Sequence, residues 1–170
     1  MELVEFGALT EHDWDEVLAG EHEPFGPVGA RLQWRQKDRH IGLRESDGRL
    51  VAVGGVATVT VEFQNGSSSE VVGLGSVIVT RPSRGRGLVS ELLYPLLAVA
   101  SGMGPDRAML FCRPELVRLY ERFDFVEITA PVWVDQPQGR VRMPMSAMWR
   151  PLRDRVGWPP GRVDVRGLPF

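Results

Sequence analysis

The residues best placed by type and spacing to do chemistry lie in one glycine-rich segment near the middle of the chain. Arg84-Gly85-Arg86-Gly87 follows the apolar run 77–79 and precedes leucines at every fourth position, 88, 92 and 96. This repeat predicts a buried helix face, so the glycines stand where a strand turns into a helix. The first N–H groups of a helix lack backbone partners and the helix dipole is positive there, so the turn is suited to hold a phosphate.

A second segment, Leu119-Tyr120-Glu121-Arg122-Phe123-Asp124-Phe125, ends a short helix predicted over 115–123. Together the two segments resemble the GNAT superfamily of N-acetyltransferases, with its acyl-CoA pyrophosphate loop and its later Leu-Tyr-Glu-x-x-Gly-Phe helix end. Two positions depart from the family pattern: Val89 stands where Gly or Ala is usual, and Asp124 where Gly is usual. Asp adopts the left-handed conformation more readily than most residues, so the helix can still end there.

The resemblance implies a donor site for acetyl-CoA and no metal. Backbone amides of the turn would hold the pyrophosphate, and the edge of the preceding strand would pair with the pantetheine arm. Tyr120 would be the catalytic residue, protonating the departing thiolate as general acid, although a packed tyrosine with a surface hydroxyl is the alternative. The residues expected to bind acetyl-CoA are Val77, Ile78, Val79, Arg84, Gly85, Arg86, Gly87, Leu88, Val89 and Ser90.

Within the superfamily, residues 84–93 and Asp164-Val165-Arg166-Gly167 are most similar to the aminoglycoside 2′-N-acetyltransferases. That subgroup carries a glutamate as remote general base two residues before the Val77 position, where this chain has Gly75. An acid expected near the end of the chain is replaced by Leu168, while Phe170 fits the aromatic residue and carboxylate that the subgroup places near the acceptor. The general base therefore stays open among Glu62, Glu70, Asp164 and the Phe170 carboxylate.

The family mechanism implied here is direct attack of a primary amine on the thioester in a ternary complex. We expect a small cationic acceptor, because residues 1–30 hold eight acids and no Lys or Arg, whereas residues 81–170 hold fourteen Arg and nine acids. Acetylation of a protein or peptide is the alternative reaction. A non-catalytic acyl-CoA-binding module is the alternative suggested by Gly75.

Composition limits the other classes. A formal net charge of −2 argues against generic nucleic-acid binding, and no apolar run is long enough for a membrane span. The first residues lack a basic segment before an apolar stretch, so we expect a cytoplasmic protein without a secretory signal. Cys112 is the only cysteine and the three histidines are scattered, which disfavours disulfides and metal clusters. Cys112 is interpreted as a buried apolar residue rather than a covalent nucleophile, since apolar neighbours raise the pKa of a thiol.

Period-2 and period-3.6 patterns predict the elements that position these residues. Strands are expected over 3–6, 39–44, 50–63, 70–79, 108–112, 125–134 and 140–149, and helices over 11–18, from 88 to about 101, and over 115–123. This order predicts a single mixed α+β domain over 1–170, with a central, mostly antiparallel, twisted sheet of about seven strands flanked by about four helices. We expect residues 150–170 to be a C-terminal extension, near the acceptor site or at a homodimer interface.

Overall fold

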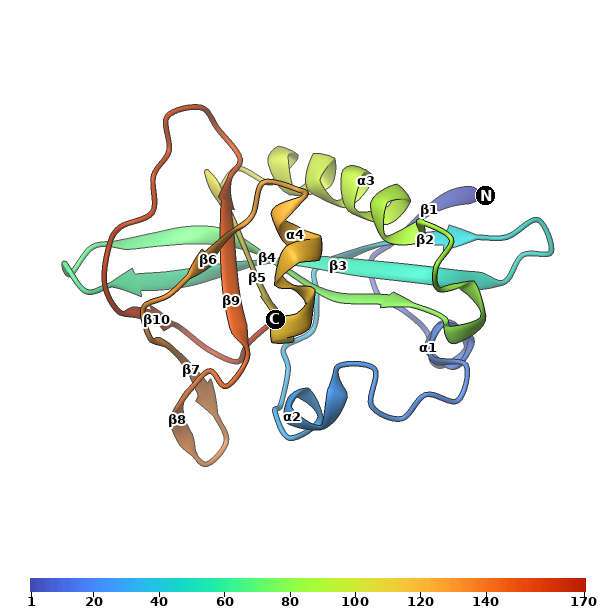
Figure 1. The fold of residues 1–170 in the computed structure, drawn as a ribbon, viewed down its shortest axis with the longest axis horizontal. Helices are drawn as coiled ribbons and strands as arrows, with labels where there is room; N and C mark the ends of the chain where they lie inside the picture. The colour runs from blue at the N-terminus through green and yellow to red at the C-terminus, as the bar shows by residue number, and fades with distance from the viewer.

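A computed structural model describes all of residues 1–170 (Figure 1). None of its helices is both long and apolar enough to cross a membrane. The elements are β1 (Glu2–Phe6), α1 (Glu11–Leu18), α2 (Gly26–Ala30), β2 (Arg39–Arg44), β3 (Leu50–Phe63), β4 (Ser68–Val79), the 3₁₀ turn η1 (Arg81–Ser83), α3 (Leu88–Gly102), β5 (Arg107–Cys112), the 3₁₀ turn η2 (Pro114–Leu116), α4 (Val117–Glu121), β6 (Val126–Ile128), β7 (Val132–Gln136), β8 (Gly139–Arg142), β9 (Ser146–Pro151) and β10 (Val163–Val165).

The strands form one mixed sheet, which confirms the predicted α+β class. Its order is β6-β9-β5-β4-β3-β10-β7-β8, with β2 and β1 continuing from the other half of β3, ten strands in all. The predicted number of strands was too low. The stretches 125–134 and 140–149 each divide in two at Pro131 and Pro144, because proline has no N–H to donate to a strand ladder. The short helix α2 and the strand β10 were also not predicted.

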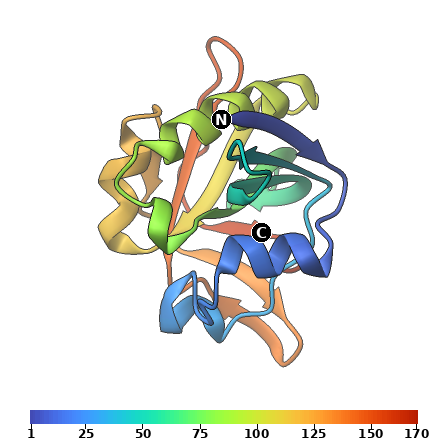
Figure 2. The ribbon, with the colours of Figure 1, turned by 90° about the vertical axis from the view of Figure 1, so that its right-hand side faces the viewer.

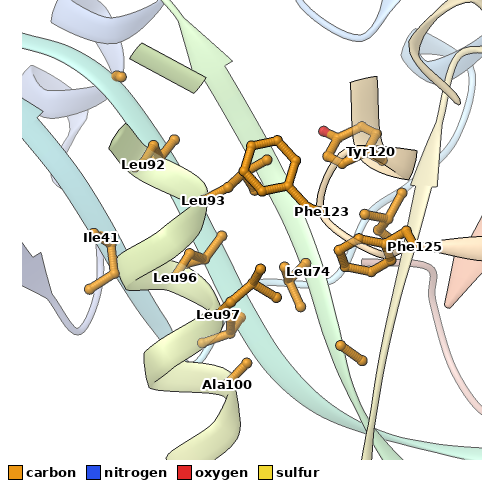
Figure 3. Packing of buried hydrophobic residues seen from close by; sticks show 14 of the residues in the cluster. Ile41, Leu74, Leu92, Leu93, Leu96, Leu97, Ala100, Tyr120, Phe123 and Phe125 are labelled. Atoms are coloured by element: carbon orange, nitrogen blue, oxygen red, sulfur yellow. The ribbon is translucent and has the colours of Figure 1, made fainter. Parts of the chain in front are cut away.

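Helices cover opposite faces of this sheet (Figure 2). On one face, Leu92, Leu96 and Ala100 of α3 join a buried cluster that extends to the aromatic residues around α4 (Figure 3). On the other face, Val17 of α1 packs with Ile78 in a separate cluster. Successive strand residues point to opposite faces, so Val79 belongs to the α3 cluster and its neighbour Ile78 to the α1 cluster.

The parallel strands β4 and β5 pair over only part of their length. Their register runs from Val72 opposite Ala108 to Leu74 opposite Leu110 and then stops. Two residues later the β4 backbone enters the left-handed region at Ser76, with φ of 53°, and a register shift against β3 accompanies it. Since β4 continues along β3 to Val79, it separates from β5 beyond Leu74, and the two strands open a space between them.

The C-terminal segment is part of the sheet. β10 lies between β3 and β7, antiparallel to the first and parallel to the second, and its Val163 and Val165 are fully buried. Phe170 is also buried, and its ring lies 4.8 Å from that of Phe111 between centroids. The segment from 163 to the last residue is therefore packed on the sheet rather than projecting from it.

Candidate active site

A cavity of about 540 Å³ occupies the opening between β4 and β5. We call its two walls the α3 side and the α1 side. The α3 side comprises the end of β4, the start of α3 and the segment from β5 to α4, and it is lined by Val77, Ile78, Val79, Arg84, Val89, Leu110, Cys112, Arg113, Leu116, Leu119 and Tyr120. The α1 side is formed by residues 8–40 with Met145 and the C-terminal residue, and is lined chiefly by Leu9, Trp14, Phe25, Trp34, Arg35, Lys37, His40, Met145 and Phe170.

The glycine-rich turn lies where the sequence predicts, between β4 and α3. Gly85 and Gly87 have φ of 78° and 80°, and Gly87 is the N-terminal cap residue of the helix. The N–H groups of residues 85–89 donate no backbone hydrogen bond, and no side chain caps the helix. Ser90 already bonds the Gly87 carbonyl at 3.0 Å, and Leu88 packs into the core. Five adjacent N–H groups are therefore free for an anion, next to the cavity rather than in its lining, since only Arg84 and Val89 of residues 84–90 line it.

The two arginines of the turn are held by carboxylates elsewhere in the chain. Arg84 pairs with Glu21 and donates through Nε to the Val79 carbonyl at 3.0 Å. Arg86 pairs with Glu45 at 2.5 Å. These contacts leave anion binding to the main chain of the turn, with the arginine charges close by.

Tyr120 lies on α4, in the part of the α3 side that the segment from β5 to α4 contributes. Its side chain is buried, packs edge-to-face against Phe125 and lines the cavity (Figure 3). Burial raises the pKa of the Tyr120 phenol above its ordinary value, so the group stays protonated at neutral pH. The helix ends as predicted, with Asp124 in the left-handed conformation at φ of 62°. The arrangement provides a proton donor in the cavity.

Cys112 is a poor nucleophile in this environment. It is buried at the end of β5, with its Sγ 3.9 Å from the Met148 sulfur. Burial raises the pKa of the thiol to about 12, so almost no thiolate exists at neutral pH. The structure thus favours the apolar interpretation of this residue.

The position of the family's glutamate is filled by two other residues. A Cβ atom at Gly75 would lie 2.6 Å from the main-chain carbonyl carbon of Phe170 and 2.8 Å from Lys37 Cε. Real Cβ atoms do not approach other atoms so closely, so only glycine fits there. Lys37 was not recognised from the sequence. The available signals were that it is the chain's single lysine and that glycines interrupt two apolar strands.

Three of the four candidate bases lie outside the cavity. Glu62 pairs with Arg166, and Asp164 with Arg162 at 2.8 Å; these hydrogen bonds hold the pKa of each carboxyl below its usual value. Glu70 is exposed near the far end of the β3–β4 hairpin. Phe170 alone among the four lines the cavity.

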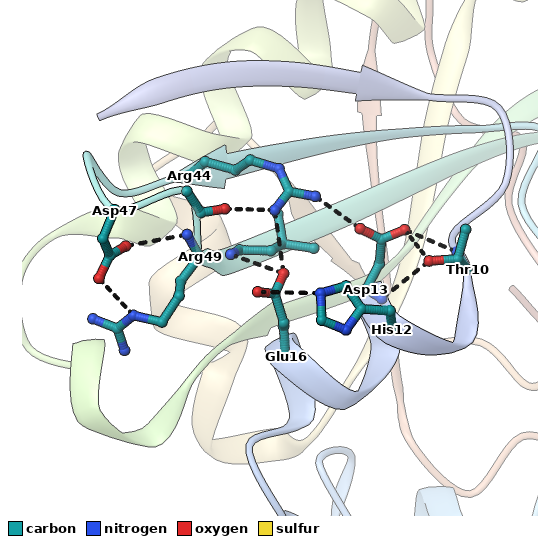
Figure 4. Close-up of polar contacts among 9 residues, drawn as sticks. Thr10, His12, Asp13, Glu16, Arg44, Asp47 and Arg49 are labelled. Carbon is teal, nitrogen blue, oxygen red and sulfur yellow. Dashed lines mark hydrogen bonds and ion pairs between the residues drawn. The ribbon is translucent and has the colours of Figure 1, made fainter.

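The acidic residues of the first thirty do not face the cavity either. Asp13 and Glu16 both bond Arg44, at 2.8 and 3.2 Å, in a network that also contains Thr10 (Figure 4). No Asp or Glu lines the cavity, and its charged residues are basic: Arg35, Lys37, Arg84 and Arg113. The charge pattern from which a cationic acceptor was predicted is therefore absent from the cavity itself.

The family follows from comparison of the sequence with known families. Residues 6–125 match the model of the Acetyltransferase (GNAT) family. The chain belongs to the GNAT acetyltransferase family. No curated protein matches it, and the aminoglycoside 2′-N-acetyltransferase subgroup is not confirmed.

Several solved structures share the fold. One is YhbS from Escherichia coli in complex with CoA, with a TM-score of 0.62 and 18% identity over 95% of this chain and 88% of that one. ElaA from the same organism has a TM-score of 0.55 and 19% identity, over 88% of this chain and 98% of that one. N-acetylglutamate synthase from Neisseria gonorrhoeae, complexed with coenzyme A and N-acetyl-glutamate, has a TM-score of 0.58 and 13% identity, over 90% of this chain and 36% of that one. At these identities the likeness establishes the fold alone.

Proposed function

We propose that this GNAT protein is an N-acetyltransferase that moves an acetyl group from acetyl-CoA to a primary amine of a small molecule. The observation that carries the proposal is the cavity between β4 and β5, which the turn with free N–H donors borders through Arg84 and Val89 and whose wall contains the buried side chain of Tyr120. The N–H groups of residues 85–89 would hold the pyrophosphate. The main chain of Val77–Val79, which pairs with no residue of β5, would pair with the pantetheine arm, although the Val79 carbonyl already accepts a hydrogen bond from Arg84 Nε.

The reaction follows from this placement. The neutral amine nitrogen attacks the thioester carbonyl carbon, the carbon–sulfur bond breaks, and Tyr120 donates its proton to the departing sulfur. The nitrogen, now part of the amide, releases one proton to water, and the Tyr120 phenolate takes a proton back from water. Tyr120 is protonated at neutral pH, because the pKa of a phenol is already near 10 and burial raises it further. Burial of Cys112 as a thiol disfavours an acetyl-cysteine intermediate and supports direct transfer in a ternary complex.

The test combines acetyl-CoA binding with thiol release. Thermal unfolding with acetyl-CoA at 100 times its dissociation constant should show about 2.7 kcal/mol of stabilisation. With an amine acceptor, Tyr120→Phe should lower kcat by roughly 100-fold or more, the range for a lost general acid, and leave the stabilisation by acetyl-CoA intact. Tyr94→Phe is the matched control, because Tyr94 is the other tyrosine of the chain and is exposed on α3.

Two results would contradict the proposal. No stabilisation by acetyl-CoA would mean that the turn does not bind it. Stabilisation without thiol release for any amine would instead identify a non-catalytic acyl-CoA-binding module.

A further inference from the structure

The α1 side of the cavity contains a buried lysine without a carboxylate partner. Lys37 is 8% exposed, and its ammonium group has one hydrogen bond, to the Arg35 carbonyl at 3.2 Å. Lysines are seldom this buried unless they are paired, because removing an ammonium group from water is costly. An ammonium has three N–H donors, so Lys37 has two left for a ligand in the cavity that it lines.

The strands beneath Lys37 are shaped to accept its side chain. Gly55 on β3 and Gly75 on β4 are direct partners in the sheet, and the lysine stem lies across both. A Cβ atom at Gly55 would lie 2.5 Å from Lys37 Cγ, and one at Gly75 would lie 2.8 Å from Lys37 Cε. Two facing glycines therefore provide the channel that brings this ammonium group to the point where β4 leaves β5.

The surrounding wall is apolar and contains no Asp or Glu side chain, and the terminal carboxylate of Phe170 lies against the same Gly75 position as Lys37 without an ion pair to the lysine. The Trp34 indole satisfies its own N–H on the Gly29 carbonyl at 2.9 Å and packs beside Phe25. Arg35 also lines the cavity and forms no ion pair with a carboxylate. The wall thus combines aromatic surface with two cations, Lys37 and Arg35, that form no ion pair within the chain.

We propose that the acceptor amine carries a carboxylate that pairs with Lys37, with Arg35 nearby, and an apolar body that packs on the aromatic wall. This inference rests on the proposed function and specifies its substrate class, an apolar amino acid or a related amino carboxylate. The amine would then lie between the Lys37 end of the cavity and the thioester beside β4.

The titration of Lys37 agrees with this assignment. Burial, and then the positive charge of Arg35, lower the pKa of Lys37 to about 8, while Asp38 opposes the shift. Burial also lowers the pKa of His40, so this neighbour is neutral at pH 7. The ammonium is therefore mostly charged at pH 7, and a bound carboxylate should raise the pKa of Lys37 by favouring its charged form.

Lys37 can be observed directly because it is the only lysine. Protein labelled with ¹³C at the lysine Cε gives one side-chain resonance, whose pH titration reports this group alone. We expect phenylacetate to raise the titration midpoint of Lys37 and phenylacetamide to leave it in place. A midpoint that phenylacetate does not raise, or that phenylacetamide raises equally, would overturn the inference.

Kinetics with matched acceptors provide the second test. We expect kcat/KM to be higher for L-phenylalanine than for L-phenylalaninamide, although the amide has the less basic and more readily neutral amine. Lys37→Met should reduce this preference by roughly 10- to 100-fold, the range for a hydrogen bond to a charged group. Arg118→Met, an exposed arginine on α4 without an ion pair, should leave the preference unchanged.

The outcomes separate the inference from the function on which it rests. Thiol release with benzylamine but not with L-phenylalanine would overturn the inference and support the acetyltransferase. Lys37→Met could instead lower kcat/KM equally for L-phenylalanine and L-phenylalaninamide, while wild-type activity increases with pH through pH 8. That result would identify Lys37 as a general base and overturn the inference as well. If acetyl-CoA neither stabilises the fold nor releases thiol, the proposed function fails. The titration midpoint of the Lys37 resonance with phenylacetate still tests the carboxylate site in that case.

Discussion

The two sides of the cavity are built in different ways. The α3 side offers main-chain groups from one continuous stretch, the end of β4 and the turn into α3, which local backbone conformation positions. The α1 side offers side chains from distant segments, among them Trp34, Lys37 and Phe170, which meet only because the sheet brings them together. A site formed by main-chain groups can therefore be recognised from a contiguous sequence motif, whereas a site formed by side chains from distant segments depends on tertiary packing.

The largest expected effect concerns the α3 side. Gly87→Glu places a carboxylate and a side chain at φ of 80° on the turn, and should abolish stabilisation by acetyl-CoA, a loss of more than roughly 100-fold in affinity. The control is Gly66→Glu, at φ of 85° in the β3–β4 hairpin, which has the same charge and similar backbone strain. Thermal unfolding with and without acetyl-CoA measures both. If both variants keep the ligand shift, the turn does not hold the donor.

The next effect concerns the α1 side and its packing. Gly75→Ala should destabilise the fold by about 1–3 kcal/mol, the usual range for overpacking, because Lys37 and the main chain of Phe170 leave no room for a methyl group. Gly102→Ala is the control, since a Cβ atom there meets nothing within 4 Å. Urea unfolding gives the free energies. A neutral or stabilising Gly75→Ala would show that Lys37 and Phe170 do not lie against β4.

The same contrast explains what could be predicted from the sequence. The turn, the helix end at Asp124 and the order of elements from β1 to α4, apart from α2, followed from residues next to one another, and the structure agrees with them. Lys37 could not be recognised, because its importance comes from Gly55 and Gly75 on two other strands. The acids of residues 1–30 were assigned to the acceptor by charge alone, whereas two of them, Asp13 and Glu16, pair with Arg44 on β2.

A smaller effect tests how the α1 side is anchored. Hydrogen bonds from Thr10, and the charge of Arg44, lower the pKa of Asp13 despite its burial. Asp13→Ala should lose about 1 kcal/mol of stability through the helix cap, and should raise the KM of the acceptor more than that of acetyl-CoA. The pKa of Asp13 is lower in the folded state than in the unfolded state. Its stabilisation is therefore complete at pH values above the unfolded-state pKa of about 4 and disappears as the pH falls through the folded-state pKa.

The measurement is urea unfolding of wild type and Asp13→Ala at pH 7 and near pH 3. Asp15→Ala is the control, an exposed carboxylate on the same helix without an ion pair. A stability difference that persists unchanged at low pH would contradict the role of the ionised Asp13.

The smallest expected effect returns to the α3 side, at the residue where the chain departs from its family. Val89 lines the cavity in the first turn of α3, where Gly or Ala is usual, and its β-branched side chain limits the space beside the free N–H groups. Val89→Ala should lower the KM of acetyl-CoA by a few-fold, less than about 1 kcal/mol. Val99→Ala makes the same change on the same helix and packs against the same cluster, but lies outside the cavity, so it should not alter this KM. A higher KM in Val89→Ala would mean that the valine contacts the donor favourably, and binding on the α3 side would then depend on a side chain as well as on the backbone.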